Sequence, residues 1–342
     1  MEIKTRPLAP GRTCHPRPTG VYLLLAALAA SILLSVVIGA RPTDLTALMG
    51  LLDGRIDSID EAAIASRLPR TLLALLAGAA LAVAGATMQG LTRNPLADPG
   101  LLGVNAGAAL AVVIGIAWFD MQQASRYIWV AIAGAGASAL LVYLVANLGR
   151  GGATPLRLAL SGAVVTAALT SLTSAVILPR ADIAGLIHSW LIGGVGGATL
   201  DRITPVLPFL ALGLAASLLA ARKLNLMALG DEAATGLGER VALARALAAV
   251  GAILLCGATT AACGPIGFVG LVVPHALRLL VGADYRRLLP LCALGGALLV
   301  ILADTLGRVL VRPAELDVGI VTALLGGPVF IWIVRRHTLR SL

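Results

Sequence analysis

Charged and aromatic residues are both scarce in this sequence. Of its 342 residues, 13% are Asp, Glu, Lys or Arg and 4% are Phe, Trp or Tyr, whereas 58% are hydrophobic. A soluble domain is about 25% charged, so the chain lacks the polar residues that would cover a surface in water. This deficit argues against a large soluble α/β protein and favours a chain whose solvent is the lipid bilayer.

Motifs of the common enzyme classes are also missing. No G-x-x-x-x-G-K-[ST] sequence is present, and neither lysine follows a glycine, so the chain has no P-loop for ATP. The motifs G-x-S-x-G and H-E-x-x-H are absent. The four cysteines form no C-x-x-C pair, and three lie in apolar runs, where cysteine behaves as a small hydrophobe. We therefore expect a chain that is not an enzyme and has no metal site and no cofactor.

No acidic residue or lysine lies at the centre of an apolar run, although ion-coupled transporters need such groups. Asp304 and Arg308 lie four residues apart near the end of one run, a spacing that predicts an ion pair on one helix. If the chain transports a solute, another protein supplies the energy. An ion-coupled secondary transporter and a membrane scaffold without transport activity stay open as alternatives of other classes.

Ten apolar runs, each compatible with a membrane-spanning helix, account for most of the chain. The 39 glycines allow helix backbones to pack closely in a membrane, which favours an all-α polytopic bundle over a β-barrel. The glycine-rich region 179–202 leaves room for a short helix that does not span. The runs lie near residues 20–40, 64–88, 100–118, 127–148, 157–178, 190–200 joined to 203–221, 242–262, 266–282, 290–307 and 318–334.

The distribution of charge predicts the orientation of these helices. Seventeen of the 26 Lys and Arg residues fall in segments that ten spans place inside, leaving net charges of +11 inside and −2 outside. Such an excess marks cytoplasmic loops, and membrane topology, not nucleic acid, then explains the pI of 10.2. We expect a cytoplasmic tail at 1–19, a transmembrane domain at 20–336 with a long cytoplasmic segment at 222–240, and a cytoplasmic tail at 337–342.

The long cytoplasmic segment has the pattern of short helices with exposed apolar side chains. Asp231 and Glu232 suit the first turn of a helix, and Gly230 and Gly236 are interpreted as hinge or cap positions. We expect four apolar side chains of "LNLMALG" to lie on a loop: Leu224, Leu226, Met227 and Leu229. The segment is either an ordinary interfacial helix pair or a surface that fits a groove on a cytoplasmic motor protein.

A second cytoplasmic feature is the polar stretch "RNPLADPG", which interrupts two apolar runs. Asn94 and Pro95 form a turn dipeptide. Asp98 is expected to cap the next helix, with Pro99 at its first position, where a missing N–H costs nothing. Together with Arg93, the stretch is interpreted as a cytoplasmic turn.

Four long stretches resemble the FecCD family, the ten-helix permease subunits of ABC importers for iron-siderophores, haem and vitamin B12. They contain "RNPLADPG" within 67–110, "LNLMALGDEAATGLG" at 224–238, "GPIGFVGLVVPHALRLLVG" within 264–308 and "PAELDVGIVTALLGGPVF" within 313–336. The resemblance implies a multi-pass protein of the inner membrane with both termini cytoplasmic. It also implies three kinds of protein partner: two cytoplasmic ATPase subunits, a periplasmic binding protein, and a second permease chain, identical or homologous.

The resemblance assigns roles to particular residues. Arg67, Arg70 and Arg308 match positions that receive acidic residues of the binding protein, although arginines there can also serve as interfacial anchors. The turn of Arg93 and Asp98 faces the ATPase. The inner gate of the family corresponds to Thr154, Pro155 and Leu156. Family members often have small hydroxyl residues there, and this chain keeps only Thr154. The residues that the resemblance implies contact the ATPase are Leu226, Ala228, Leu229, Gly230, Asp231, Glu232, Gly236, Leu237 and Gly238.

The resemblance also favours one substrate. The stretch "AACGPIGFVGLVVPH" is more similar to siderophore permeases than to those for cobalamin or haem. We therefore expect an iron(III)-siderophore importer, with haem and cobalamin as alternatives.

Overall fold

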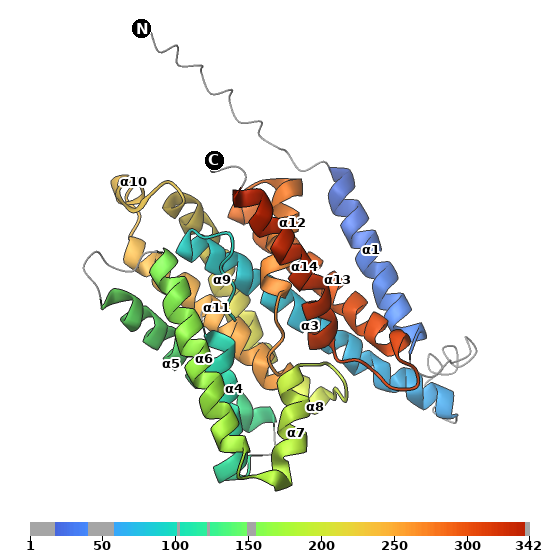
Figure 1. Ribbon diagram of the computed structural model, residues 1–342. Helices are drawn as coiled ribbons and strands as arrows, with labels where there is room; N and C mark the ends of the chain where they lie inside the picture. The colour runs from blue at the N-terminus through green and yellow to red at the C-terminus, as the bar shows by residue number, and fades with distance from the viewer. Residues whose placement is uncertain (1–17, 40–57, 101–102, 122–123, 149–154, 339–342) are drawn as a thin grey trace.

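The computed structural model describes residues 18–39, 58–100, 103–121, 124–148 and 155–338, and every regular element within them is a helix (Figure 1). This confirms the all-α prediction. The helices are α1 (Pro18–Val37), α3 (Ile59–Thr92), α4 (Val104–Phe119), α5 (Ala124–Asn147), α6 (Pro155–Ile177), α7 (Ala181–Ile192), α8 (Leu200–Ile203), α9 (Leu207–Met227), α10 (Asp231–Gly236), α11 (Val241–Cys263), α12 (Val269–Val281), α13 (Tyr285–Leu310) and α14 (Val318–Thr338).

Each of the ten predicted apolar runs overlaps a helix of the structure. Among the described residues, seven helices are long and apolar enough to cross a bilayer, and α4, α7, α12 and part of α14 are shorter apolar helices. The region 179–202 contains the separate short helix α7. The protein is therefore polytopic, while the count of ten spans and the orientation of the termini stay predictions.

Helix α3 is the longest helix of the bundle and one of its most buried. Its 34 residues extend about 51 Å at 1.5 Å per residue, and it packs against α13, α11 and α12. Ser58 starts the helix with a capping box, in which its side chain accepts from Glu61 N and its own N–H donates to the Glu61 carboxylate. Arg67 and Arg70 lie near one end of this helix and Arg93 follows the other, so α3 connects both ends of the bundle.

Glycine lets α3 touch its neighbours backbone to backbone. A Cβ added at Gly78 would lie 2.2 Å from the carbonyl oxygen of Gly296 on α13, and one at Gly85 would lie 2.0 Å from that of Gly270 on α12. No side chain fits at either crossing. This close approach is how small residues hold helices together in lipid, where expulsion of water contributes nothing.

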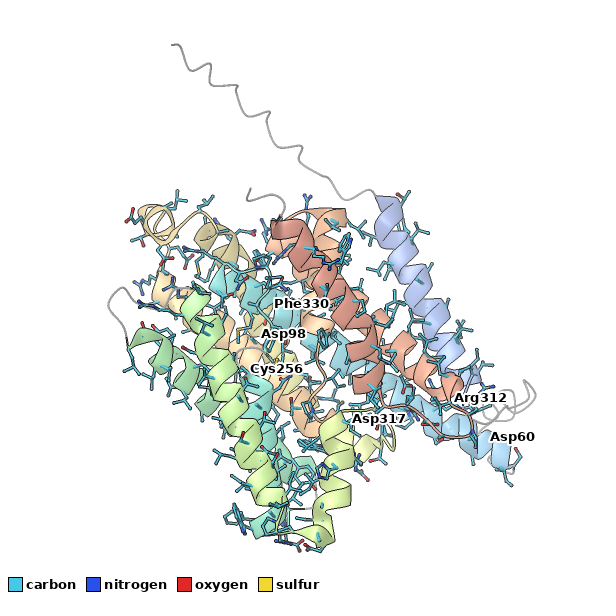
Figure 2. All side chains as sticks on the ribbon, in the orientation of Figure 1. Asp60, Asp98, Cys256, Arg312, Asp317 and Phe330 are labelled. Atoms are coloured by element: carbon cyan, nitrogen blue, oxygen red, sulfur yellow. The ribbon has the colours of Figure 1, made fainter. Side chains whose placement is uncertain are left out.

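The segment between α3 and α4 does not stay at the end of the bundle. Asp98 is buried, and a Cβ at Gly270 would lie 3.0 Å from its Oδ2, so this part of the turn reaches the α3–α12 crossing. Figure 2 shows Asp98 well inside the bundle. Because the chain begins α4 only at Val104 after this inward excursion, α4 is shorter than the predicted run 100–118.

Candidate functional site

The predicted cytoplasmic segment forms a compact helical turn at one end of the bundle. Helix α9 continues to Met227, so Leu226 lies on α9, and both Leu224 and Met227 are fully buried. The expectation that "LNLMALG" leaves its apolar side chains on a loop is therefore wrong for Leu224, Leu226 and Met227, and it is confirmed for Leu229, which follows α9. The burial of Leu224 and Met227 follows from the helical period, which turns them towards the bundle once α9 extends past residue 223. The exposed part begins at Ala228.

Helix α10 follows, and its acidic first turn confirms the pattern seen in the sequence. Asp231 and Glu232 occupy that turn, where carboxylates interact favourably with the helix dipole. Two leucines flank the helix, Leu229 before it and Leu237 after it, and they are 65% and 62% exposed. These side chains give the segment a small apolar surface that the described part of the chain does not cover.

Glycine is required at two positions of this segment, and Gly236 is not one of them. Gly230 has φ +110° and Gly238 has φ +82°, values that L side chains rarely adopt. Gly236 is the last residue of α10, with nothing within 4 Å of an added Cβ. The interpretation of Gly230 as a cap is confirmed, because it is the N-cap of α10. The positive φ that closes the segment belongs to Gly238, and the residue after α10 is Leu237, so the interpretation of Gly236 as a cap is wrong.

We expect Gly238→Ala to destabilise the segment and Gly236→Ala to have no such effect. A left-handed alanine costs about 1–2 kcal/mol, whereas alanine at a helical, open position is as good as glycine or better. Melting of the purified protein and trypsin sensitivity of the segment would measure the difference. Equal behaviour of the two variants would contradict the assignment.

The structure brings the turn after α3 against the α10 segment, although they are 138 residues apart. Arg93 ends α3 in a left-handed conformation, and its guanidinium forms an ion pair with Asp231. Arg245, at the start of α11, pairs with the other carboxylate oxygen of Asp231 at 2.6 Å. All three side chains are partly exposed. The sequence separately predicted Arg93 and Asp231 as functional, but nothing in it indicated that they meet.

The turn confirms one prediction about its residues and contradicts another. Asn94 Oδ1 accepts from Leu96 N at 2.9 Å, so Asn94-Pro95 starts a turn as predicted. Asp98 does not cap α4, because Gly103 is the N-cap and Asp98 Oδ1 accepts from Gly100 N. Pro99 is likewise outside the helix. Since Asp98 is buried beside Gly270, it does not offer a surface to another protein.

Polar contacts fix the segment to the adjacent helices. Lys223 Nζ lies 2.7 Å from Glu239 Oε1, which joins α9 to the chain after α10. Asn225 donates to Asp284 Oδ1 at 2.6 Å and accepts from Tyr285 N, which joins α9 to the start of α13. Burial acts to raise the pKa of Asp284, but the hydrogen bonds from Asn225 and Arg286 N, together with the positive charges of Arg287 and Arg286, leave the pKa below its ordinary value.

The three arginines predicted for docking lie at the opposite end of the bundle, where Arg70 and Arg308 share one buried carboxylate. Asp304 is fully buried, and Arg70 donates to its carboxylate from Nε and Nη2 at 2.9 and 2.7 Å. Arg308 pairs with the same carboxylate at 2.9 Å, which confirms the ion pair predicted from the i,i+4 spacing. Arg70 also reaches Glu315 at 2.6 Å.

Two of these arginines hold the end of α1. Arg67 donates to the carbonyls of Val36 and Val37, and Arg308 donates to those of Ser35 and Ile38. The last carbonyls of a helix have no partner within it and carry the negative end of its dipole, so cations are favourable there.

Two of the three arginines predicted to receive acidic residues of the binding protein are therefore not at the surface of the chain. Arg67 and Arg308 are 6% and 1% exposed and turn inwards to α1. Figure 2 places Asp60 and Arg312, which flank this network, at the end of the molecule far from α10. No sequence pattern indicated Ser35 or Glu315 as partners, because each lies far along the chain from the arginine that it binds.

The structure describes only two of the three residues predicted to form the inner gate. Thr154 lies outside the described residues. Pro155 begins α6, and Leu156 is exposed.

Comparison with known proteins identifies the family. The model of the FecCD transport family matches residues 27–336. The chain belongs to this family. It is 43% identical to the ferric enterobactin transport system permease protein FepD of Escherichia coli (strain K12), covering 96% of this chain and 98% of that protein. It is also 43% identical to the hemin transport system permease protein HmuU of Yersinia pestis, over 79% and 82% of the two chains.

Solved structures agree with this assignment. A chain described as a metal-chelate type ABC transporter in an inward-facing conformation matches with a TM-score of 0.79 and 29% identity, covering 93% of this chain and 99% of that one. A chain of PsaBC from Streptococcus pneumoniae matches with a TM-score of 0.60 at 15% identity, which shows the fold alone. This FecCD protein is thus a multi-pass permease of the inner membrane.

Proposed function

We propose that this FecCD protein is the membrane subunit of an ABC importer that carries an iron(III)-siderophore complex inward. The observation that carries the proposal is the 43% identity, over nearly the whole of both chains, with a permease named for ferric enterobactin. Another relative, 40% identical over 79% of this chain, is a probable siderophore permease of Bacillus subtilis. Haem is the second candidate substrate, because HmuU is as similar over its matched length.

The energy for transport comes, in this proposal, from two ATPase subunits that bind the segment 228–240. Leu229 and Leu237 provide its apolar contacts, and Arg93 and Arg245 hold Asp231 so that α10 keeps a fixed position. A second permease chain completes the membrane part. A periplasmic binding protein delivers the substrate to the end formed by α1, α3 and α13. Since Arg67 and Arg308 are buried there, they support the docking surface by fixing α1 and do not contact the partner directly.

Uptake of radiolabelled iron into a strain that lacks its own permease tests the substrate. The full importer should accumulate iron supplied as a catecholate, hydroxamate or citrate chelate. Uptake of haem and of cobalamin, each supplied separately, is measured in the same strain to decide between the alternative substrates. Accumulation of haem or cobalamin alone would overturn the siderophore assignment.

Introducing a charge at the exposed leucines is expected to detach the motor. Aspartate at Leu229 or Leu237 places a carboxylate in an apolar contact, and loss of such an anchor weakens binding tenfold or more. ATPase co-purified with tagged permease should fall by at least that factor, while the melting temperature is unchanged. The matched control is Leu178→Asp. Leu178 is an exposed leucine that follows the last residue of α6, away from the segment 228–240. Full recovery of the ATPase with either aspartate would contradict the proposal.

Reporter fusions test the orientation that the charges predict. A reporter after Leu342 and another within 225–238 should both be cytoplasmic, and one near Asp57 should lie outside. The basis is the net charge of +11 on the predicted inner segments. An external signal from the C-terminal fusion would mean an odd number of spans.

A further inference from the structure

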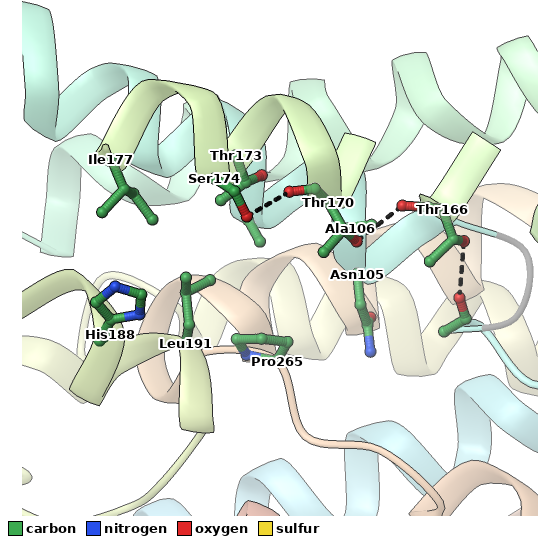
Figure 3. Close-up of a pocket in the computed structure, with 12 residues that line it drawn as sticks. Asn105, Ala106, Thr166, Thr170, Thr173, Ser174, Ile177, His188, Leu191 and Pro265 are labelled. Atoms are coloured by element: carbon green, nitrogen blue, oxygen red, sulfur yellow. Dashed lines mark hydrogen bonds between the residues drawn. The ribbon is translucent and has the colours of Figure 1, made fainter. Parts of the chain in front are cut away.

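The cavity between α4, α6 and α7 offers no fixed charge to a ligand (Figure 3). Its volume is about 390 Å³, and none of the residues that line it is Asp, Glu, Lys or Arg. On its α6 wall, Thr170 and Ser174 donate to carbonyls of α6 itself, as the dashed lines in Figure 3 show. A charged group placed there would lose its hydration without gaining a counter-ion. A group of exposed arginines lies instead at the end of the bundle that carries α10.

A fixed turn joins α12 to α13 at this end. Asn225, near the end of α9, donates to Asp284 Oδ1 at 2.6 Å and accepts from Tyr285 N at 2.9 Å. Arg278, in the last turn of α12, donates to the Tyr285 hydroxyl at 2.9 Å and lies over its ring, 5.5 Å from the centroid. Tyr285 is itself buried and lies close to Gly90 of α3. The start of α13 is therefore held by three other helices.

Three exposed arginines stand on this platform: Arg222 on α9, and Arg286 and Arg287 in the first turn of α13. Arg222 lies one turn before Asn225, on the same face of α9. Within the part of the chain that the structure describes, Arg222 and Arg286 form no ion pair, and Arg287 lies 4.0 Å from Asp284. That carboxylate also accepts from Asn225 and from Arg286 N. We call the three arginines the basic patch, because one carboxylate offsets their charge only in part.

The length of α13 places this patch at the surface of the membrane. The helix has 26 residues and is apolar enough to cross a bilayer. It extends about 39 Å, or about 37 Å along the membrane normal at the usual tilt of about 20°. The hydrocarbon core is about 30 Å thick, and no charged residue lies between Arg287 and Asp304. The first turn of α13, with Arg286 and Arg287, therefore lies among the lipid headgroups.

Exposed leucines lie beside the patch, towards the hydrocarbon core. Leu218 precedes Arg222 by four residues, so the two share one face of α9, and Leu219 next to it is 69% exposed. On α12, Leu279 and Leu280 are exposed just before the turn to α13. A cationic surface with exposed apolar side chains below it complements a molecule that has an anionic head and a hydrocarbon tail.

We propose that the basic patch binds the phosphate of an anionic phospholipid, of the phosphatidylglycerol type, in the leaflet on the α10 side of the membrane. Arg286 and Arg287 bind the phosphate oxygens, because a guanidinium can donate two parallel hydrogen bonds to them, and Arg222 adds charge from α9. Basic residues next to a membrane-spanning helix attract anionic lipids. The arginines beside α10 do not have this role, since they already share a carboxylate. The inference does not depend on which substrate is transported.

Native mass spectrometry of the full-length permease, purified in detergent with its ATPase, tests the lipid site. The protein is titrated with dioleoyl phosphatidylglycerol or, separately, with dioleoyl phosphatidylcholine, and the dissociation constant of the first lipid bound to each permease chain is measured. Each basic residue near an anionic lipid contributes about a fivefold gain in affinity. We therefore expect Arg286→Gln combined with Arg287→Gln to weaken the binding of phosphatidylglycerol about thirtyfold and to leave phosphatidylcholine unchanged.

Two further variants keep the test decisive. Arg126→Gln combined with Arg202→Gln is the matched control, because it also removes two exposed arginines, on α5 and α8, outside the patch. This control should bind phosphatidylglycerol as the wild type does. Arg222→Gln alone should weaken the binding about fivefold, which provides a measurement even if the double variant of α13 does not fold.

A soluble headgroup distinguishes a lipid from a free phosphate ester. Glycerophosphoglycerol, which has the same phosphate but no acyl chains, should bind at least tenfold more weakly than phosphatidylglycerol. Equal binding would show a site for small anions and would overturn the lipid proposal. The proposal would also be overturned if the wild type bound both lipids equally, or if the double variant of α13 kept its affinity for phosphatidylglycerol. Loss of co-purified ATPase in that variant, with lipid affinity unchanged, would assign the patch to the motor instead.

Discussion

Replacing Asp304 with asparagine is expected to remove most of the folded permease from the membrane. The carboxylate of Asp304 is fully buried between Arg70 and Arg308. Asparagine keeps the shape but leaves the buried guanidinium of Arg308 without its carboxylate, while Arg70 keeps only the partly exposed Glu315. Removing one member of a buried ion pair costs about 3–5 kcal/mol, which is a large part of the stability of most proteins. The amount of protein in the membrane and its melting temperature in detergent measure the effect.

Glu315 provides the matched control for this experiment. It also binds Arg70, but its side chain is 38% exposed, and exposed pairs contribute only about 0–1 kcal/mol. Glu315→Gln should therefore be recovered at nearly the wild-type level. If Asp304→Asn folded normally and lost only its affinity for the binding protein, the network would be a docking site and not a structural support.

The second large effect is expected at the crossing of α3 and α12. Leucine at Gly85 would place its Cβ only 2.0 Å from the carbonyl oxygen of Gly270. The two helices would have to separate, and excess volume in a packed interior costs about 1–3 kcal/mol or more. Separation would also disturb Asp98, which packs against Gly270. We expect Gly85→Leu to yield little folded permease, judged by size-exclusion chromatography and thermal melting.

A glycine with space around it shows whether close approach is the cause. Gly136 lies on the membrane-spanning helix α5, and the nearest atom to an added Cβ is 3.9 Å away. Gly136→Ala should be neutral or slightly stabilising, because alanine favours a helix. If both variants lost a similar amount of folded permease, any replacement of a helix glycine would be harmful. That result would refute the packing explanation.

Features set by neighbouring residues were predictable from the sequence. Runs of apolar residues locate the helices because a bilayer requires a nearly continuous apolar stretch. The acidic first turn of α10 and the pair of Asp304 with Arg308 depend on residues within one turn of each other. The expected cap at Asp98 failed because the chain first turns inward to Gly270, a contact that no local pattern encodes.

Composition and periodicity by themselves determined that this chain is an all-α membrane protein without an ATP site of the P-loop kind. Tertiary structure alone decided which polar groups meet. Arg70 reaches Asp304 across 234 residues, and Arg93 reaches Asp231 across 138. Arginine near a membrane surface has the same sequence signature whether it turns towards a partner or back into its own bundle. Here it turns inward, because the unpaired carbonyls of α1 and the buried carboxylate of Asp304 lie within its reach and need a cation.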